Sequence, residues 1–368
     1  MTMDRQTFAL KGFVKTLTPL SQNPYTNRST PNGENHQRMG RLKIVTPDNA
    51  VENSDGVIRG MVTEVPVFSA NGMRGMLRRA CAEVILDKFL AEGVKAPVHV
   101  VQWMFAGAAR NAKETLSKAA LPALIQDETM ISGNIHAGLF GGGLGLPSAF
   151  KIEDLVPCVD EVNTAGLLED ISTIADLPKA WEILGFRGWV RVDDLSRRDS
   201  GHKLRFFDAS DLEEALALAE EERKKRNRAN KSKAKAKSDG ETYVGEDDLG
   251  VAAGQLGIVE YIAPGVSMVF RAFFDHVAPA QVGLFIKGLE RFGDDPRIGS
   301  NARWGFGRVS LMLEDDLGRR VSVGDGSFTQ DGFDAEIEAF ENWLGQVDVD
   351  RLDTMAILPT DKKEKESK

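Results

Sequence analysis

Three arginines gather at the start of the segment SANGMRGMLRRACAEVILDKFL, residues 69–90. Arg74, Arg78 and Arg79 follow a turn-like Ser-Ala-Asn-Gly and fall in the first turns of a helical pattern. The N-terminal end of a helix carries partial positive charge, so cations are unfavourable there unless an anion joins them. Backbone N–H groups at such an end bind phosphate, and arginine adds charge-assisted hydrogen bonds. The cluster therefore predicts an anion-binding site.

Two glycine-rich stretches could bring the backbone close to a ligand. In RIGSNARWGFGRVSL (297–311), Arg303 and Arg308 alternate with Trp304 and Phe306, and such side chains suit phosphates and bases respectively. A tight turn whose aromatic rings pack into the core is an equally good interpretation. The stretch GLFGGGLGLP (138–147) has neither a clear strand before it nor an apolar helix after it. It predicts a loop near another backbone or a phosphate rather than a dinucleotide site.

Basic charge is concentrated in RKKRNRANKSKAKAK (223–237), which holds nine Lys and Arg residues and no acid. Without these nine, 37 of the 46 Lys and Arg residues remain against 55 Asp and Glu residues, a net charge of -18. This segregation is typical of a protein with one anion-binding face and an acidic remainder. The segment by itself favours a solvated, disordered loop.

Metal sites and activated nucleophiles are not predicted. The five histidines show no paired spacing, and neither cysteine has a close partner in the sequence. The sequence also has no GxSxG motif and no phosphate-binding loop ending in Gly-Lys-Ser/Thr. We therefore expect no catalytic residue, no metal and no cofactor.

The elements that must position these residues follow a simple order. Residues 7–17 alternate apolar and polar side chains as a strand does, and 73–84 have helical spacing, with Ser69 or Asn71 as N-cap. Residues 255–277 give two alternating runs broken by Pro-Gly, which indicates a hairpin. A helix over 279–292 and a strand over 307–314 follow. Strand–helix–strand–strand–helix–strand is the α+β, ferredoxin-like order.

This plan divides the chain into a discontinuous domain and its insertions. The ferredoxin-like domain comprises residues 1–17, 67–94 and 255–315. A polar, turn-rich insertion covers 18–66, and a second one, with the glycine-rich segment and the basic run, covers 95–254. Loops of this length are functional or disordered. Residues 316–368 are expected to form a short helix over 335–344 and a disordered tail.

The composition fits a globular protein, with 42% hydrophobic and 27% charged residues. Two cysteines fit a reducing compartment, and the N-terminus reads as a strand rather than a signal peptide. No uncharged apolar run reaches about 18 residues. We expect a cytoplasmic protein without a membrane segment.

Taken together, three motifs resemble those of one family. SANGMRGMLRR resembles the Gly-x-x-Leu-Arg-Gly-x-x-Arg helix start of the RAMP superfamily of CRISPR proteins, with Met73 where Ser or Leu is common. GLFGG (138–142) resembles the family's Leu-Phe-Gly segment, and IGSNARWGFGRV (298–309) resembles its C-terminal glycine-rich loop. The motifs occur in family order, and the resemblance touches most of residues 5–315.

The resemblance is greatest to the backbone subunit of class 1 effector complexes, and within them to the type IV protein. It implies a non-catalytic subunit that binds guide RNA (crRNA), oligomerises along it and presents the guide for pairing. The implied partners are crRNA, further copies of the chain, other CRISPR effector subunits, and target DNA or RNA. It also implies a hand-like shape: a ferredoxin-like palm, a finger-like insertion at 18–66 and a thumb-like basic region within 95–254.

The resemblance further implies which residues bind. The residues expected to contact crRNA are Asn71, Gly72, Arg74, Arg78, Arg79, Phe140, Gly141, Gly142, Asn301, Arg303, Trp304, Arg28 and Arg38. The thumb residues expected to contact the target are Arg223, Lys224, Lys225, Arg226 and Arg228.

Two other functions stay open. In type III relatives an Asp after the first strand cleaves target RNA, so the chain could be a target-RNA endoribonuclease subunit. The corresponding loop offers Glu34, Asp48 and Asp55, none in a matching context. A stand-alone RNA-recognition module would not need the long insertions.

Overall fold

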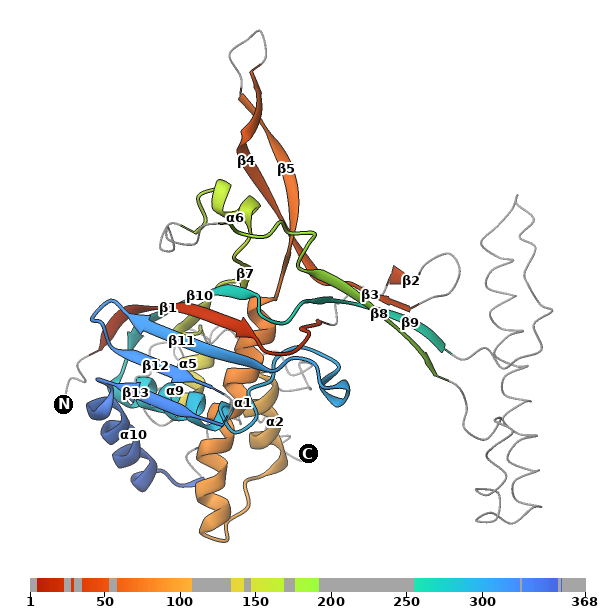
Figure 1. Ribbon diagram of the computed structural model, residues 1–368. Coiled ribbons are helices and arrows are strands. Elements are labelled where there is room, and N and C mark those ends of the chain that lie inside the picture. Colours follow the sequence, from red (N-terminus) through yellow and green to blue (C-terminus); the bar gives the residue numbers. More distant parts are fainter. Residues whose placement is uncertain are drawn as a thin grey trace, which may run out of the picture. The chain divides into compact units, whose positions relative to one another are not determined.

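A computed structural model gives the structure of residues 5–22, 28–29, 35–52, 58–107, 134–141, 147–168, 176–191, 255–324, 326–349 and 352. The chain divides into two compact units, drawn in Figure 1. The first comprises Met1–Asn27, Gln37–Phe186 and Val259–Lys368, and the second comprises Arg28–His36 and Arg187–Ile258. Gly142, the basic run 223–237 and the tail after 352 lie outside the described residues.

The first unit is built on a seven-stranded sheet in which all the strand pairs are antiparallel. Its strand order is β13-β12-β11-β1-β10-β6, and β7 also pairs with β10. The predicted first strand is confirmed as β1, in which Leu10 and Val14 are buried whereas Lys11 and Lys15 are exposed. The strands are β1 (Gln6–Thr16), β6 (Phe150–Ile152), β7 (Val156–Pro157), β10 (Ser267–Val277), β11 (Val309–Asp315), β12 (Arg320–Val323) and β13 (Phe328–Asp331).

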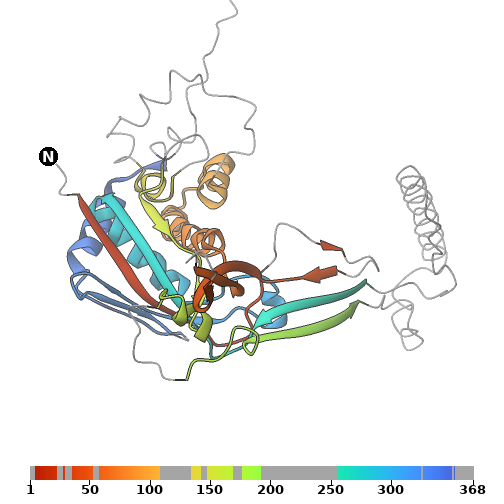
Figure 2. The same ribbon diagram turned by 90° about the horizontal axis from the view of Figure 1, so that it is seen from above.

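Helices lie on one side of these strands, as Figure 2 shows. The two predicted helices are α1 (Ala70–Ala91) and α9 (Pro279–Phe292), which pack on each other, and α10 (Asp334–Gln346) packs on α9. Two glycines of α9 permit this close packing. A Cβ on Gly288 would lie 2.2 Å from Cys81 Sγ, and one on Gly283 would lie 2.0 Å from the carbonyl oxygen of Glu336.

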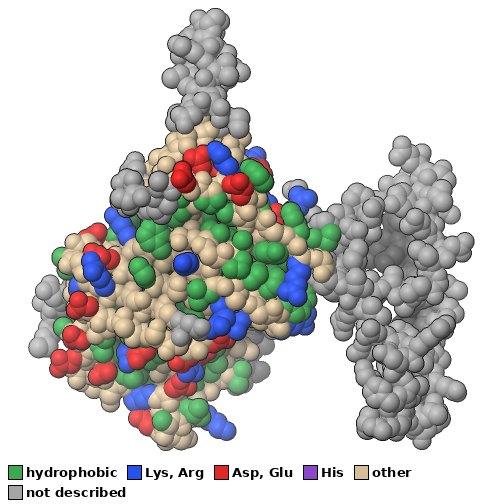
Figure 3. Space-filling model, in the orientation of Figure 1, with side chains coloured by type: hydrophobic (Ala, Val, Ile, Leu, Met, Phe, Trp, Pro, Cys, Tyr) green, Lys and Arg blue, Asp and Glu red, His purple; other side chains and the backbone are tan. Residues whose placement is uncertain are grey.

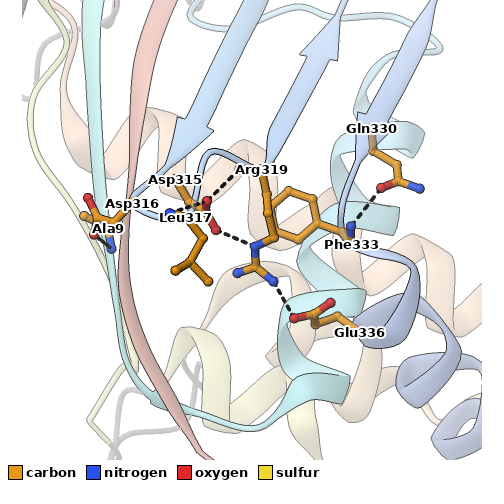
Figure 4. A network of polar contacts seen from close by, with 8 residues as sticks. All are labelled: Ala9, Asp315, Asp316, Leu317, Arg319, Gln330, Phe333 and Glu336. Carbon is orange, nitrogen blue, oxygen red and sulfur yellow. Dashed lines mark hydrogen bonds and ion pairs between the residues drawn. The ribbon is translucent and has the colours of Figure 1, made fainter.

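A half-buried arginine, Arg319, connects α10 to the sheet (Figure 4). Arg319 donates from Nε to Asp315 Oδ2 (2.6 Å) and from Nη1 to Glu336 Oε1 (2.5 Å), and its guanidinium lies 4.4 Å from the centre of the Phe333 ring. Asp315 also accepts from the N–H groups of Leu317 and Arg319 (2.9 Å each). Buried charges are tolerated when they are paired in this way.

The predicted hairpin over 255–277 is wrong in one respect. Its two runs are strands, but β9 (Gln255–Ile262) belongs to a separate sheet of order β2-β3-β9-β8, whereas β10 belongs to the seven-stranded sheet. The connecting Pro-Gly turn is bound instead to β1, because the Gly265 N–H donates to the Thr16 carbonyl (2.6 Å). The short strand β6 lies beside β10 in place of β9. The other strands of the small sheet are β2 (Arg28–Ser29), β3 (Asn35–Gln37) and β8 (Leu184–Arg191).

Two further differences concern the domain boundaries. The predicted domain stops at 315, yet β12 and β13 extend the same sheet to Asp331. The insertion 18–66 contains a hairpin of β4 (Gly40–Glu52) and β5 (Ile58–Val67) that the sequence analysis did not predict. The predicted C-terminal helix is confirmed as α10. Among the described helices, none is long and apolar enough to cross a membrane.

Candidate nucleic-acid interface

The first turn of α1 is capped from other parts of the chain. Ser69 occupies the N-cap position with extended backbone, but its side chain makes no capping hydrogen bond among the described residues. Instead the Ala70 N–H donates to Asp154 Oδ1 (2.6 Å), and the Ser69 N–H donates to Gln22 Oε1 (2.9 Å). The Gly72 N–H donates to the Ser69 carbonyl (2.9 Å). Part of the positive end of the helix is therefore already occupied by the chain's own acceptors.

The arginines of α1 reach the C-terminal ends of two other helices. Arg78 donates from Nε (3.2 Å) and Nη2 (3.0 Å) to the Phe105 carbonyl, in the last turn of α2 (Val98–Ala106). Arg74 donates from Nη2 to the carbonyl of Phe140, the last residue of α5 (Ile135–Phe140). Helix C-termini present unsatisfied carbonyls and partial negative charge, so cations are favourable there. This is one reason why the arginines lie on this helix.

The cluster nevertheless keeps its positive charge. Arg74, Arg78 and Arg79 are half-buried, and none forms an ion pair with any residue that the structure describes. Burial lowers the pKa of all three guanidinium groups, and the neighbouring Arg74 and Arg79 lower the pKa of Arg78 further. Glu83 opposes this effect at Arg79, where it raises the pKa. Three like charges in partly desolvated positions are stabilised by an anion that reaches them.

Arg74 has unused hydrogen-bonding capacity. Its Nε is buried and has no hydrogen-bond partner within the described residues. An unsatisfied donor on a charged group is costly, and because this atom is fully buried an external acceptor reaches it only after the side chain moves. A phosphate oxygen is such an acceptor.

The short helix α5 is held in place by buried polar groups. Asn134 Oδ1 accepts from the Ala137 N–H (3.0 Å), and His136 Nε2 lies 3.0 Å from the Arg78 carbonyl oxygen. Burial lowers the pKa of His136 to about 4, so the ring is neutral at neutral pH and Nε2–H is the donor. These contacts fix the carbonyl that Arg74 binds.

The C-terminal glycine-rich loop packs near the start of α1. Gly299 has a positive φ of 86°, and a Cβ there would lie 2.2 Å from the Ser21 carbonyl and 3.3 Å from the Phe68 ring. The same ring lies against Gly72, where a Cβ would meet it at 3.0 Å. Asn301, also at positive φ, donates from Nδ2 to Ser21 Oγ (3.0 Å). The glycine-rich loop, residues 20–22 and the start of α1 are therefore neighbours.

Of the two aromatic residues of this loop, one packs into the core and the other is partly exposed. Phe306 is 1% exposed and packs edge-on against Tyr261, so it belongs to the core. Trp304 is half-buried, and the exposed Arg303 lies 5.5 Å from the centre of its ring. Of the two aromatic residues, Trp304 is therefore the one that a ligand could reach, with Arg303 beside it.

Some of the residues expected to bind RNA are exposed in the structure, and others are buried or lie outside the described residues. Asn71 and Arg38 are exposed, and Asn71 lies on the same turn as Gly72, near the glycine-rich loop. Phe140 and Gly141, which are expected to contact crRNA, are both buried, and the Phe140 ring is 1% exposed and packs against Phe150. For Arg28 the structure describes only the backbone in β2, and Gly142 and the five thumb residues lie outside the described residues.

Sequence reasoning missed the partners of the arginines. The Phe105 and Phe140 carbonyls, which accept from Arg78 and Arg74, lie 27 and 66 positions away from them. The Asp154 carboxylate, which accepts from the Ala70 N–H at the start of α1, lies 84 positions away. It also missed Glu260, which is buried and accepts from Arg41 (2.5 Å) and from the Met39 N–H (2.7 Å). No local pattern marks such acceptors. Within the described ranges, no group of three His, Cys, Asp or Glu residues could hold a metal ion.

Comparisons with known proteins give a family match. The family model "RAMP superfamily" matches residues 41–310. Among solved structures, one titled "Type IV-B CRISPR Complex" is similar at 13% sequence identity and a TM-score of 0.41, covering 83% of this chain and 90% of that chain. No curated protein matches the sequence significantly.

Proposed function

The chain belongs to the RAMP superfamily, and from that premise we propose that it is a non-catalytic, guide-RNA-binding backbone subunit of a CRISPR effector ribonucleoprotein. In this proposal it oligomerises along the crRNA in a type IV-like complex and presents the guide for pairing with foreign nucleic acid. Its partners are crRNA, further copies of itself, other effector subunits and the target strand.

The arginine cluster of α1 is the observation that carries this proposal. Arg74, Arg78 and Arg79 are half-buried without an ion pair in the described residues, and a buried Nε of Arg74 lacks an acceptor. A phosphate of the guide backbone supplies the missing negative charge and several acceptor oxygens. In the proposal the exposed Asn71, Arg38 and Arg303 also contact the RNA.

The strand order supports a ferredoxin-like palm. The central four strands, β11-β1-β10-β6, are antiparallel, and α1 and α9 are the two crossover helices. With β6 as the second strand, this is the order of a split βαβ fold. In the proposal the β4–β5 hairpin belongs to a finger, and the basic run 223–237 belongs to a thumb that contacts the target.

We propose that the chain holds nucleic acid without cutting it. Metal-assisted cleavage requires carboxylates that converge on a divalent ion, and metal-free cleavage requires a placed general base. The acids of the polar loop, Glu34, Asp48, Glu52 and Asp55, are scattered in sequence. The arginines favour binding of phosphates over attack on them.

The test is to purify the full chain with its associated nucleic acid and to sequence what is bound. Guide-like RNA of defined register on a multimeric particle is the expected result. A variant with Arg74, Arg78 and Arg79 changed to Gln should lose RNA. The control is Arg291→Gln, because Arg291 is already neutralised by Glu83, Asp87 and Asp294. A particle without RNA, or RNA retained equally by both variants, contradicts the proposal.

A further inference from the structure

Among the described helices, none covers the face of the seven-stranded sheet opposite to α1 and α9. Side chains of β1, β10, β11, β12 and β13 line a groove of about 860 Å³ on it. Figure 3 views this face, where hydrophobic side chains lie between well-separated charged ones. The groove is distinct from the arginine cluster, because α1 packs on the other side of the strands.

Strand register arranges the groove in two rows. One row crosses the sheet as Arg271, Lys11, Glu314, Arg320 and Asp331, each directly opposite the next. The neighbouring row crosses it as Val156, Val269, Phe13, Met312, Ser322 and Thr329. One row is therefore charged, and the other is apolar over its first four positions.

The central strand carries a basic–aromatic–basic pattern on this face. Lys11, Phe13 and Lys15 alternate with inward residues, so neighbouring members are about 7 Å apart. Phe13 is half-buried and makes no aromatic ring contact in the described residues, and Met312 beside it is 65% exposed. Phe13 packs partly against the core, and its exposed part lies beside Met312, its partner across the strands.

Both signs of charge line the groove, Asp316 and Asp331 among them, and the basic residues that form no ion pair with a described residue lie on β1. Glu314 is paired with Arg320 (2.8 Å), and Arg271 lies near Glu153 (3.7 Å). Lys11 and Lys15 are exposed and form no ion pair with any described residue. Gly12 between Lys11 and Phe13 lets β1 approach β11 closely, since a Cβ there would lie 1.9 Å from the Met312 carbonyl oxygen. This approach keeps Phe13 and Met312 side by side.

We propose that this face is a second nucleic-acid site, which takes a short single-stranded segment along β1. A base stacks on Phe13 and Met312, and Lys11 and Lys15 bind the phosphates on either side. Stacking on an aromatic ring tolerates any base, and lysine reads only backbone charge. The site therefore binds single strands with little sequence preference, independently of the ligand that the α1 arginines bind.

Photo-crosslinking of the full chain tests this proposal. The probes are 5-iodouridine-substituted oligo(U) RNA and the equivalent oligo(dT) DNA, and crosslinked peptides are identified by mass spectrometry. A crosslink within residues 11–15 is expected with both probes. Phe13→Leu keeps apolar bulk and should weaken binding about tenfold in a background that lacks the α1 arginines. Lys11→Gln and Lys15→Gln should each reduce the salt slope by about 0.7.

Lys287→Gln is the matched control, because Lys287 lies on α9 and is paired with Glu290. Crosslinks confined to α1 or the glycine-rich loop, with affinity unchanged in Phe13→Leu, overturn the second site and leave the guide-binding function standing. Crosslinks at residues 11–15 without any at α1 support the second site and contradict the first. If Phe13→Leu instead changes only the sedimentation of the protein, the face is a protein interface and the proposal is wrong.

Discussion

Arg78 has two roles in our proposal, and its replacement separates them. In the folded chain its guanidinium donates twice to the Phe105 carbonyl, and it is repelled by Arg74 and Arg79. A hydrogen bond from a charged donor is worth about 1.5–3 kcal/mol. Relief of the repulsion offsets part of this, so Arg78→Ala should lower the free energy of unfolding by about 1–2 kcal/mol.

The effect on RNA is expected to be separate and electrostatic. One lost phosphate contact should reduce the slope of log affinity against log salt by about 0.7 for single-stranded RNA. The loss should be equal on RNAs of unrelated sequence, since a phosphate contact reads no base. Arg78→Lys keeps the charge but loses the forked donor geometry, so it should retain most of the slope while losing stability.

The assay is fluorescence anisotropy of labelled single-stranded RNA over a series of salt concentrations, with urea denaturation measured in parallel. Arg291→Ala is the control for removal of an arginine whose charge is already balanced. If Arg78→Ala lowered stability but left both affinity and salt slope unchanged, the arginine would only support α2. The phosphate-binding role would then be refuted.

Three further predictions follow from the chemistry of the chain. His136 has a pKa of about 4 when folded and 6.5 when unfolded, so the unfolded state binds more protons between these values. The free energy of unfolding should therefore fall by about 3 kcal/mol as the pH drops from 6.5 to 4. His136→Gln should flatten the dependence of this free energy on pH over the same range. Deleting 223–237 should leave the melting temperature nearly unchanged and weaken target binding; a large drop in melting temperature would place the segment in the fold. The purified assembly should not cleave complementary RNA or single-stranded DNA with Mg²⁺ or Mn²⁺; regular fragments that vanish in Asp48→Ala or Asp55→Ala, with binding intact, would show a nuclease.

The sequence predicts strands and helices better than it predicts strand partners. Alternation in 7–17 and helical spacing in α1 and α9 are local signals, and the structure confirms those elements. The Pro-Gly turn after β9 predicts a hairpin from local sequence, but its backbone is bound to Thr16, about 250 positions earlier. The three-residue β6 is too short for any periodic pattern to mark it. Pairing is decided by long-range contacts that no window of sequence contains.

The same distinction applies to the candidate site. The arginines at the start of α1 predict an anion-binding site, and in the structure they form no ion pair with a described residue. The sequence did not show that Arg74 and Arg78 also bind the carbonyl ends of α5 and α2, because those ends are distant along the chain. Nor did it show that Phe140 points into the core rather than toward a ligand.

The contact between α9 and α10 limits how the C-terminal part of the chain can be engineered. Gly283 touches the backbone at Glu336, and Phe333, Phe340 and Leu352 are buried. A shortened chain that ends before α10 would expose the surface around Gly283, and Arg319 would keep Asp315 but lose its second carboxylate partner, Glu336. Affinity tags and fusion partners are therefore best joined beyond residue 352, where the described core ends.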